Sequence, residues 1–227
     1  MEDAYDSLQR RNGLMNTMMN YLYDPLCGWC YGATNAVSAA LAAPGVTVTL
    51  LPTGLFSGAG ARDMDDDFAS YAWSNDQRIG ELTGQGFTEQ YRQQVLADRG
   101  QRFDSGPATM ALTAVHSTAP AREFDALKAI QRSRYVVGAD ITSLATLARL
   151  LEGLDLREAA SMLTDPKTAL LAQARIDQVR VLMREFGLRG VPGFIAESPE
   201  KRWVLNPNAA YADPSALVDQ LEKPDLR

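Results

Sequence analysis

The segment between residues 18 and 51 constrains the fold more than any other part of the chain. A short apolar and aromatic run, Met18 to Tyr23, ends in an Asp-Pro pair, which is typical of a buried strand followed by a turn. An alanine-rich stretch from Trp29 to Ala43 has helical spacing and stops at a Pro-Gly pair. The β-branched run from Val46 to Leu51 predicts a second strand. The opening is therefore a β-α-β unit, whose strands should pair in parallel through a right-handed crossover.

Both cysteines of the chain, Cys27 and Cys30, lie where the first strand meets this helix. A disulfide across one helical turn closes a very short loop, so it reduces the entropy of the unfolded chain little and stabilises the fold little. The pair is better suited to a disulfide that forms and breaks during a reaction. Half of a zinc site has the same spacing, but tetrahedral zinc needs about four ligands, and the chain adds only one histidine, His116. A zinc site would require carboxylates or a second chain, whereas a redox dithiol requires nothing further. We therefore expect redox chemistry, with no metal and no cofactor.

The positions of the two cysteines predict different roles for them. Cys27 lies at the expected N-terminus of the helix, where backbone N–H groups and the helix dipole favour a thiolate. Cys30 lies one turn inside and should be less exposed. We therefore expect Cys27 to act as the nucleophile and Cys30 to resolve the mixed disulfide. The alternative is a structural role, in which both are small apolar core residues.

The middle of the chain has a different character. Between residues 53 and 165 the pattern indicates helices separated by Gly, Pro or Asp, without a convincing strand. The expected helices cover residues 65–82, 88–97, 107–117, 123–136 and 143–151, with N-caps at Thr88 and Thr142. We interpret this region as a helical insertion.

The last part of the chain should return to the sheet. Residues 166–186 predict a helix with an apolar stripe, residues 191–196 and 202–205 a β-hairpin, and residues 213–221 a final helix with Asp213 as its N-cap. We expect residues 18–52 and 166–227 to form one α/β domain, residues 53–165 an inserted helical domain, and residues 1–17 an N-terminal extension.

Composition and charge limit the classes of protein to which the chain can belong. Hydrophobic residues make up 46% and charged residues 22%, which is an ordinary globular balance. The net charge of −6 argues against nucleic-acid binding, because phosphate neutralisation requires clustered Lys and Arg. The chain has no apolar run of about 18 residues that could span a membrane. Its first twenty residues lack the apolar stretch of a secretory signal, so we expect a cytoplasmic protein, while a periplasmic mature form stays open.

The order of these elements, together with two motifs, resembles the thioredoxin fold as elaborated in the DsbA superfamily. The motifs are the segment from Tyr23 to Gly32, which contains Cys27-Gly28-Trp29-Cys30, and the segment from Gly190 to Phe194, which contains Val191-Pro192. Together they are similar to the DsbA-family proteins described as predicted protein-disulfide isomerases, including FrnE-like members. The resemblance implies a thioredoxin-like α/β fold, β-α-β followed by α-β-β-α, with a large helical insertion.

The resemblance also implies an activity, a substrate contact and a class of partner. It implies a dithiol-disulfide oxidoreductase that exchanges disulfides with protein or peptide thiols, with glutathione as a further candidate partner. In the family the proline that matches Pro192 is cis and faces the cysteine pair. The backbone of Val191 would then pair with an extended substrate segment. From the base rate of X-Pro bonds alone, a trans bond would be expected.

Three residues around the cysteines each allow more than one interpretation. DsbA-type oxidases usually have His directly before the second cysteine, whereas this chain has Trp29, whose indole supplies no positive charge. Gly28 matches thioredoxin and protein disulfide isomerase, but the dipeptide does not assign a reduction potential, which we expect between about −120 and −270 mV. Trp29 could contact peptide substrates or pack against the insertion. Asp24 could assist proton transfer from Cys30, or serve as a turn residue before Pro25.

Two other functions remain open at this point. Kappa-class glutathione transferases and hydroxychromene-carboxylate isomerases are similar in fold, but they generally do not rely on a Cys-x-x-Cys motif. A non-enzymatic peptide-binding module, with a groove near Trp29 and Val191, is the second alternative. Whether the dithiol oxidises, reduces or isomerises its substrates does not follow from the sequence.

Overall fold

A computed structural model describes residues 17–222 of the chain. Apart from Thr17, the expected N-terminal extension lies outside these residues. A four-stranded sheet forms the centre, with the order β2-β1-β5-β6. Its strands are β1 (Thr17–Tyr23), β2 (Val46–Pro52), β5 (Gly193–Glu197) and β6 (Arg202–Val204). The β1 and β2 strands are parallel, and β5 and β6 complete the sheet as an antiparallel hairpin. This is the expected β-α-β unit joined to a β-hairpin.

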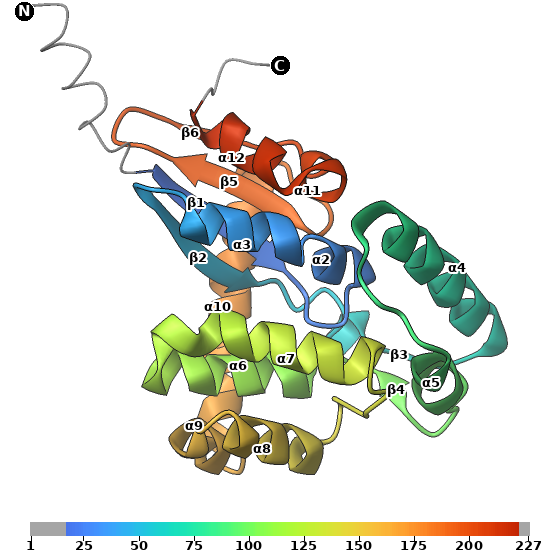
Figure 1. The fold of residues 1–227 in the computed structure, drawn as a ribbon. Helices are drawn as coiled ribbons and strands as arrows, with labels where there is room; N and C mark the ends of the chain where they lie inside the picture. Colours follow the sequence, from blue (N-terminus) through green and yellow to red (C-terminus); the bar gives the residue numbers. More distant parts are fainter. Residues whose placement is uncertain (1–16, 223–227) are drawn as a thin grey trace, which may run out of the picture.

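Helices cover both faces of this sheet (Figure 1). On one face, α3 (Thr34–Ala42) packs against α12 (Pro214–Glu222), and α10 (Pro166–Glu185) crosses the other face. Alternation along β1 explains the two layers, because successive side chains of a strand point to opposite faces. Leu22 packs with Val179 of α10, whereas Tyr21 and its neighbours join the larger core cluster.

The connection between β2 and α10 is largely helical, as expected (Figure 1). It contains α4 (Asp66–Thr83), α5 (Glu89–Tyr91), a π-helical turn (Arg92–Leu96), α6 (Gly106–Thr118), α7 (Glu123–Tyr135), α8 (Leu144–Gly153) and α9 (Arg157–Met162), with 3₁₀ turns at Gly58–Gly60 and Pro120–Arg122. Buried residues of this region and of the sheet belong to one contiguous hydrophobic cluster. The domain boundaries stay a prediction.

Several local expectations are wrong. The insertion contains a short antiparallel pair, β3 (Arg62–Asp63) with β4 (Arg102–Phe103), whose two-residue strands are too short to leave a sequence pattern. The α9 helix was not expected. The N-cap of α8 is Ser143 rather than Thr142, since the Ser143 side chain accepts a hydrogen bond from the Thr146 N–H. The expected N-cap at Thr88 is confirmed.

The helix that carries the cysteines is also different from the expected one. It is not continuous from Trp29 to Ala43 but consists of α2 (Gly28–Gly32) and α3, separated at Ala33. The Thr34 hydroxyl donates to the Tyr31 carbonyl oxygen at 2.6 Å, which satisfies a carbonyl at the end of α2. The cysteine pair therefore occupies a short helix of its own. The described chain ends with α11 (Ala209–Ala212) followed by α12.

Candidate active site

The turn after β1 places Cys27 at the start of α2. The Asp24 carboxylate accepts a hydrogen bond from the Leu26 N–H at 3.0 Å, and the Asp24 carbonyl oxygen accepts one from the Cys27 N–H, also at 3.0 Å. Cys27 is the N-cap residue, with φ −83° and ψ 115°. Asp-Pro thus forms the turn, and the first backbone N–H groups of α2 lie next to the Cys27 side chain.

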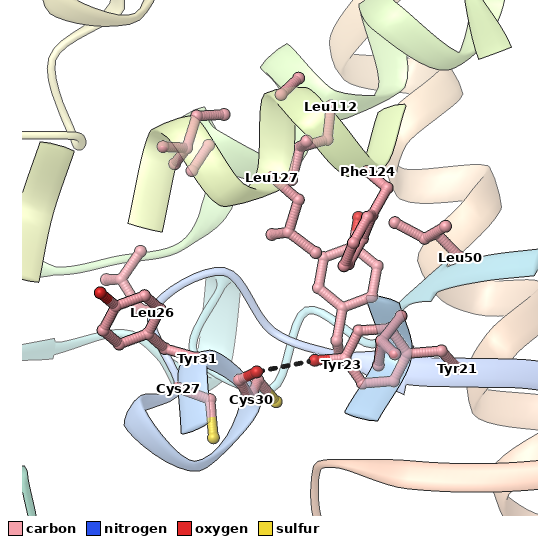
Figure 2. Close-up of a cluster of buried hydrophobic side chains, with 14 of the residues drawn as sticks. Tyr21, Tyr23, Leu26, Cys27, Cys30, Tyr31, Leu50, Leu112, Phe124 and Leu127 are labelled. Atoms are coloured by element: carbon pink, nitrogen blue, oxygen red, sulfur yellow. Dashed lines mark hydrogen bonds between the residues drawn. The ribbon is translucent and has the colours of Figure 1, made fainter. Parts of the chain in front are cut away.

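The two thiols are reduced in this structure and differ in burial. Cys27 is 7% exposed, whereas Cys30 is completely buried, which is the expected order. Figure 2 shows both cysteines beside the tyrosines of β1, where the Tyr21 hydroxyl donates to the Cys30 carbonyl oxygen at 3.0 Å. Burial raises the pKa of the Cys30 thiol well above its ordinary value, and its hydrogen bond with the Cys27 side chain raises it further.

The loop before β5, which contains Val191 and Pro192, contacts Cys27. The Val191-Pro192 peptide bond is cis, the geometry that the family resemblance implied. The Cys27 thiol donates to the Val191 carbonyl oxygen, with an Sγ to oxygen distance of 3.7 Å. The fold therefore brings together residues that are 164 positions apart in the sequence.

Asp24 lies in the turn that precedes Cys27 and is completely buried. Its Oδ2 atom accepts hydrogen bonds from the Ser105 hydroxyl at 2.8 Å and from the Phe56 N–H at 3.1 Å. Burial raises the pKa of Asp24 above its ordinary value of 3.8, although these hydrogen bonds oppose the shift. Asp24 is thus both a turn residue and a buried carboxyl whose charge acts on Cys30.

Trp29 packs against the C-terminal part of the chain rather than against the insertion alone. Its ring lies 4.9 Å from the ring of Tyr211 in α11, measured between centroids. The Arg78 guanidinium of α4 lies 5.9 Å from the centre of the Trp29 ring. Trp29 remains half-buried and lines a cavity next to Cys27, so a substrate contact is compatible with its packing.

Sequence reasoning missed the residues of the insertion that complete the site. The Tyr135 hydroxyl of α7 donates to the Leu26 carbonyl oxygen at 2.8 Å, and its ring stacks on Tyr31 at 4.9 Å. Asp76 of α4 lies against Gly28, where an added β-carbon would be 2.3 Å from its Oδ1 atom. No local pattern in the sequence marks either residue, because each contact joins segments far apart along the chain.

The part of the chain that the structure describes contains neither a candidate metal cluster nor a candidate membrane span. Among residues 17–222, no three His, Cys, Asp or Glu side chains are grouped so that they could hold a metal ion. His116 instead lies 2.7 Å from Glu123, measured between Nδ1 and Oε2. None of the helices between these limits is long and apolar enough to cross a membrane.

We predict that Asp76→Asn makes stability less dependent on pH. Burial raises the pKa of Asp76 from 3.8 to about 7, so between these values the folded chain retains a proton that the unfolded chain releases. The free energy of unfolding of the wild type should therefore fall, relative to the variant, as the pH rises from 3.8 to about 7. Urea titrations across this range would measure the difference. Asp67→Asn, which removes an exposed carboxylate from the same helix, is the control; parallel curves for Asp76→Asn and the wild type would contradict the prediction.

The fold and the site together define the class of protein. A thioredoxin-like sheet with a Cys-x-x-Cys pair at a helix start is the arrangement of a thiol-disulfide oxidoreductase. The comparison with solved structures agrees. The cytosolic disulfide reductase DsbM from Pseudomonas aeruginosa is 32% identical and superposes with a TM-score of 0.81, over 91% of this chain and 98% of that one. The chain therefore belongs to the DsbA family of thioredoxin-fold oxidoreductases.

Other solved structures are similar at lower identity. The same P. aeruginosa enzyme with GSH matches at 30% identity with a TM-score of 0.77, over 91% of this chain and 98% of that one. Oxidoreductase DsbA from Xylella fastidiosa is 13% identical with a TM-score of 0.53, over 91% and 86% of the two chains. A 2-hydroxychromene-2-carboxylate isomerase is 16% identical with a TM-score of 0.55, over 92% and 99%. The last two likenesses concern the fold alone. No family model and no curated protein matches the chain.

Proposed function

We propose that this oxidoreductase reduces disulfides, with Cys27 as the nucleophile and Cys30 as the resolving thiol. The Cys27 thiolate attacks one sulfur of the substrate disulfide, which forms a mixed disulfide and releases one substrate thiolate that takes up a proton. Cys30 then loses its proton and attacks the Cys27 sulfur, which releases the second substrate thiol. The substrate gains two electrons and two protons in total, and the protein is left with a Cys27–Cys30 disulfide.

The observation that carries this proposal is the asymmetry of the two thiols. Cys27 lies at the start of α2 and lines a cavity, whereas Cys30 is completely buried behind it. An incoming disulfide can therefore meet the Cys27 sulfur first, and Cys30 can react only with a partner already bound to Cys27. The same geometry disfavours a purely structural pair.

Three observations support reduction rather than oxidation. A strong oxidant gains its driving force from a stabilised reduced form. Here Trp29 stands where DsbA-type oxidases usually have His, and burial disfavours the Cys30 thiolate. The relative with 32% identity is itself described as a disulfide reductase.

Glutathione is the proposed source of electrons. The relative from P. aeruginosa is described as cytosolic, and one of its structures contains GSH. Two glutathione thiols would return the Cys27–Cys30 disulfide to the dithiol and leave as oxidised glutathione, so that electrons balance over one cycle. A reducing compartment such as the cytoplasm supplies this thiol in excess.

Protein and peptide disulfides are the proposed substrates, with Val191 and Pro192 as the substrate-binding residues. The Val191 carbonyl oxygen already accepts a hydrogen bond from the Cys27 thiol in the free protein. An extended substrate segment would replace this contact with backbone hydrogen bonds when Cys27 becomes part of a mixed disulfide. Gly28 and Trp29 would form the surface of α2 that faces this segment.

A glutathione-coupled assay tests the function. Wild-type protein should reduce a peptide disulfide at the expense of glutathione, and Cys30→Ser should lose most of this activity because the mixed disulfide is no longer resolved internally. If Cys30→Ser retained the full rate, a glutathione-linked reaction through one thiol would explain the activity better. This outcome would favour the transferase or isomerase alternative.

Asp24 is proposed to accept the proton that Cys30 loses. We predict that Asp24→Asn slows the attack of Cys30 on the mixed disulfide by about 100-fold, the usual contribution of a positioned proton acceptor. The raised pKa of Asp24 means that the wild-type rate should rise with pH above the ordinary carboxyl range, and the variant should lack this rise. Stopped-flow measurement of single turnover separates this step from the first attack by Cys27, which serves as the internal control. An equal slowing of both steps would contradict the assigned role.

A further inference from the structure

A cavity of about 130 Å³ lies between the start of α2, which carries Cys27, and α4. Cys27, Gly28 and Trp29 form one side of it, and residues of the insertion, among them Phe68 and Asp76, form the other. The Cys27 side chain and side chains of the insertion therefore line the same cavity. Most of its lining is aromatic or aliphatic.

Asp76 is the only carboxylate among the described residues that line this cavity. The side chain is buried, with 5% exposure, and its Oδ2 atom accepts a hydrogen bond from the Tyr91 hydroxyl at 2.9 Å. Its Oδ1 atom accepts no hydrogen bond from any residue between 17 and 222. That atom faces Gly28, where even a β-carbon would approach to 2.3 Å. The carboxyl is thus held in place and presents one free acceptor beside the dithiol.

Among the described residues, no cationic side chain forms an ion pair with the Oδ1 atom of Asp76. Arg134 of α7 is 2% exposed and stacks on Tyr91, with its guanidinium carbon 5.4 Å from the ring centre. Its charge lowers the pKa of Asp76, but burial has the larger effect and raises the pKa to about 7. Arg134 does not line the cavity, whereas Asp76 does, so a cation bound in the cavity would be a second one beside Asp76. Such a cation would favour the ionised carboxylate.

We propose that this cavity is a subsite for the ammonium group of a small aliphatic thiol or disulfide, with Asp76 as the residue that determines this specificity. The inference rests on the proposed disulfide reduction and names a substrate class for it. Aromatic walls suit an organic cation, because ring faces carry negative partial charge, and Phe56 and Tyr71 line the cavity without a cation of the described residues over their rings. An ammonium at Oδ1 would hold the neighbouring sulfur next to Cys27. The γ-glutamyl amine of glutathione belongs to this class.

Two disulfides of equal length test the subsite. Cystamine and bis(2-hydroxyethyl) disulfide differ only in that an ammonium replaces a hydroxyl at each end. We expect the ratio of their kcat/KM values to fall by about tenfold in Asp76→Asn, as for the loss of one charge-assisted hydrogen bond. The ratio should not change in Asp67→Asn, which removes an exposed charge from the same helix. An unchanged ratio in Asp76→Asn would overturn the proposal.

The pH dependence of the wild-type ratio gives a second test that requires no variant. Cys27, Tyr91, Arg134 and Tyr135 also face Asp76. The Cys27 thiol attacks both disulfides, so its contribution is common to the two rates. Tyr91 and Tyr135 stay uncharged near neutral pH, because burial raises the pKa of both phenols. Preference for cystamine should therefore rise severalfold between about pH 6 and about pH 8, as Asp76 ionises around pH 7. A flat ratio would overturn the subsite, even if Asp76→Asn failed to fold. Failure of the wild type to reduce either disulfide would instead contradict the proposed function on which the subsite rests.

Discussion

Cys27→Ser should abolish disulfide reduction while leaving the fold intact. A serine hydroxyl does not ionise near neutral pH, so the variant has no nucleophile at the start of α2 and cannot form a mixed disulfide. Cys30 cannot substitute for it, because its side chain is completely buried and its pKa is raised. Glutathione-coupled turnover of a peptide disulfide measures the loss. Circular dichroism and the unfolding midpoint should show that the variant is folded.

Cys30→Ser is the matched control for this prediction. It retains the nucleophile but lacks the resolving thiol, so a peptide disulfide should become attached to Cys27, and the protein mass should rise by that of the peptide. The double variant should form no adduct. If Cys27→Ser still turned over substrate at the wild-type rate, or if the peptide became attached to Cys30, the roles of the two thiols would be wrong.

Glu123→Gln should destabilise the protein far more than the removal of an exposed charge from the same helix. Glu123 of α7 is 3% exposed, and its Oε1 atom lies 2.8 Å from the Arg175 guanidinium of α10. Arg175 also donates to the Leu50 carbonyl oxygen of β2 at 3.2 Å, so the pair joins the insertion to the sheet. Removing one charge of a buried pair leaves the other uncompensated, and we expect a loss of about 3–5 kcal/mol. Urea unfolding measures this loss.

Asp125→Asn provides the control for Glu123→Gln. Asp125 belongs to the same helix and pairs with Arg122 and Lys128, but all three side chains are substantially exposed. Exposed ion pairs contribute little, so this change should cost less than about 1 kcal/mol. Similar losses for the two variants would show that Glu123 has no special role in joining the insertion to the sheet.

The sequence predicted most of the sheet and the cysteine pair because both depend on local patterns. An apolar and aromatic run marks β1, a β-branched run marks β2, and the Val191-Pro192 segment marks the start of the hairpin. The break at Ala33 was missed because alanine favours a continuous helix, and here the Thr34 side chain satisfies the Tyr31 carbonyl instead. Helix propensity alone does not report such a hydrogen bond between a side chain and the backbone.

The second half of the site could not be predicted because it depends on contacts between distant segments. Asp76 appears in the sequence as one more polar residue of an amphipathic helix, and only the packing of α4 against α2 places it beside Gly28. Glu123 likewise reads as an ordinary acidic residue at a helix start. Their burial follows from how the insertion docks on the sheet, and a single sequence contains no direct signal for it.

The reduction potential of the Cys27–Cys30 pair tests the central claim most directly. Equilibration with mixtures of reduced and oxidised glutathione, followed by alkylation of free thiols and mass measurement, gives the fraction of disulfide at each ratio. A reducing dithiol without a positive charge at Trp29 should have a potential nearer to that of thioredoxin, about −270 mV, than to that of DsbA, about −120 mV. A value of about −120 mV, which is that of a strong oxidant, would contradict the assignment as a reductase.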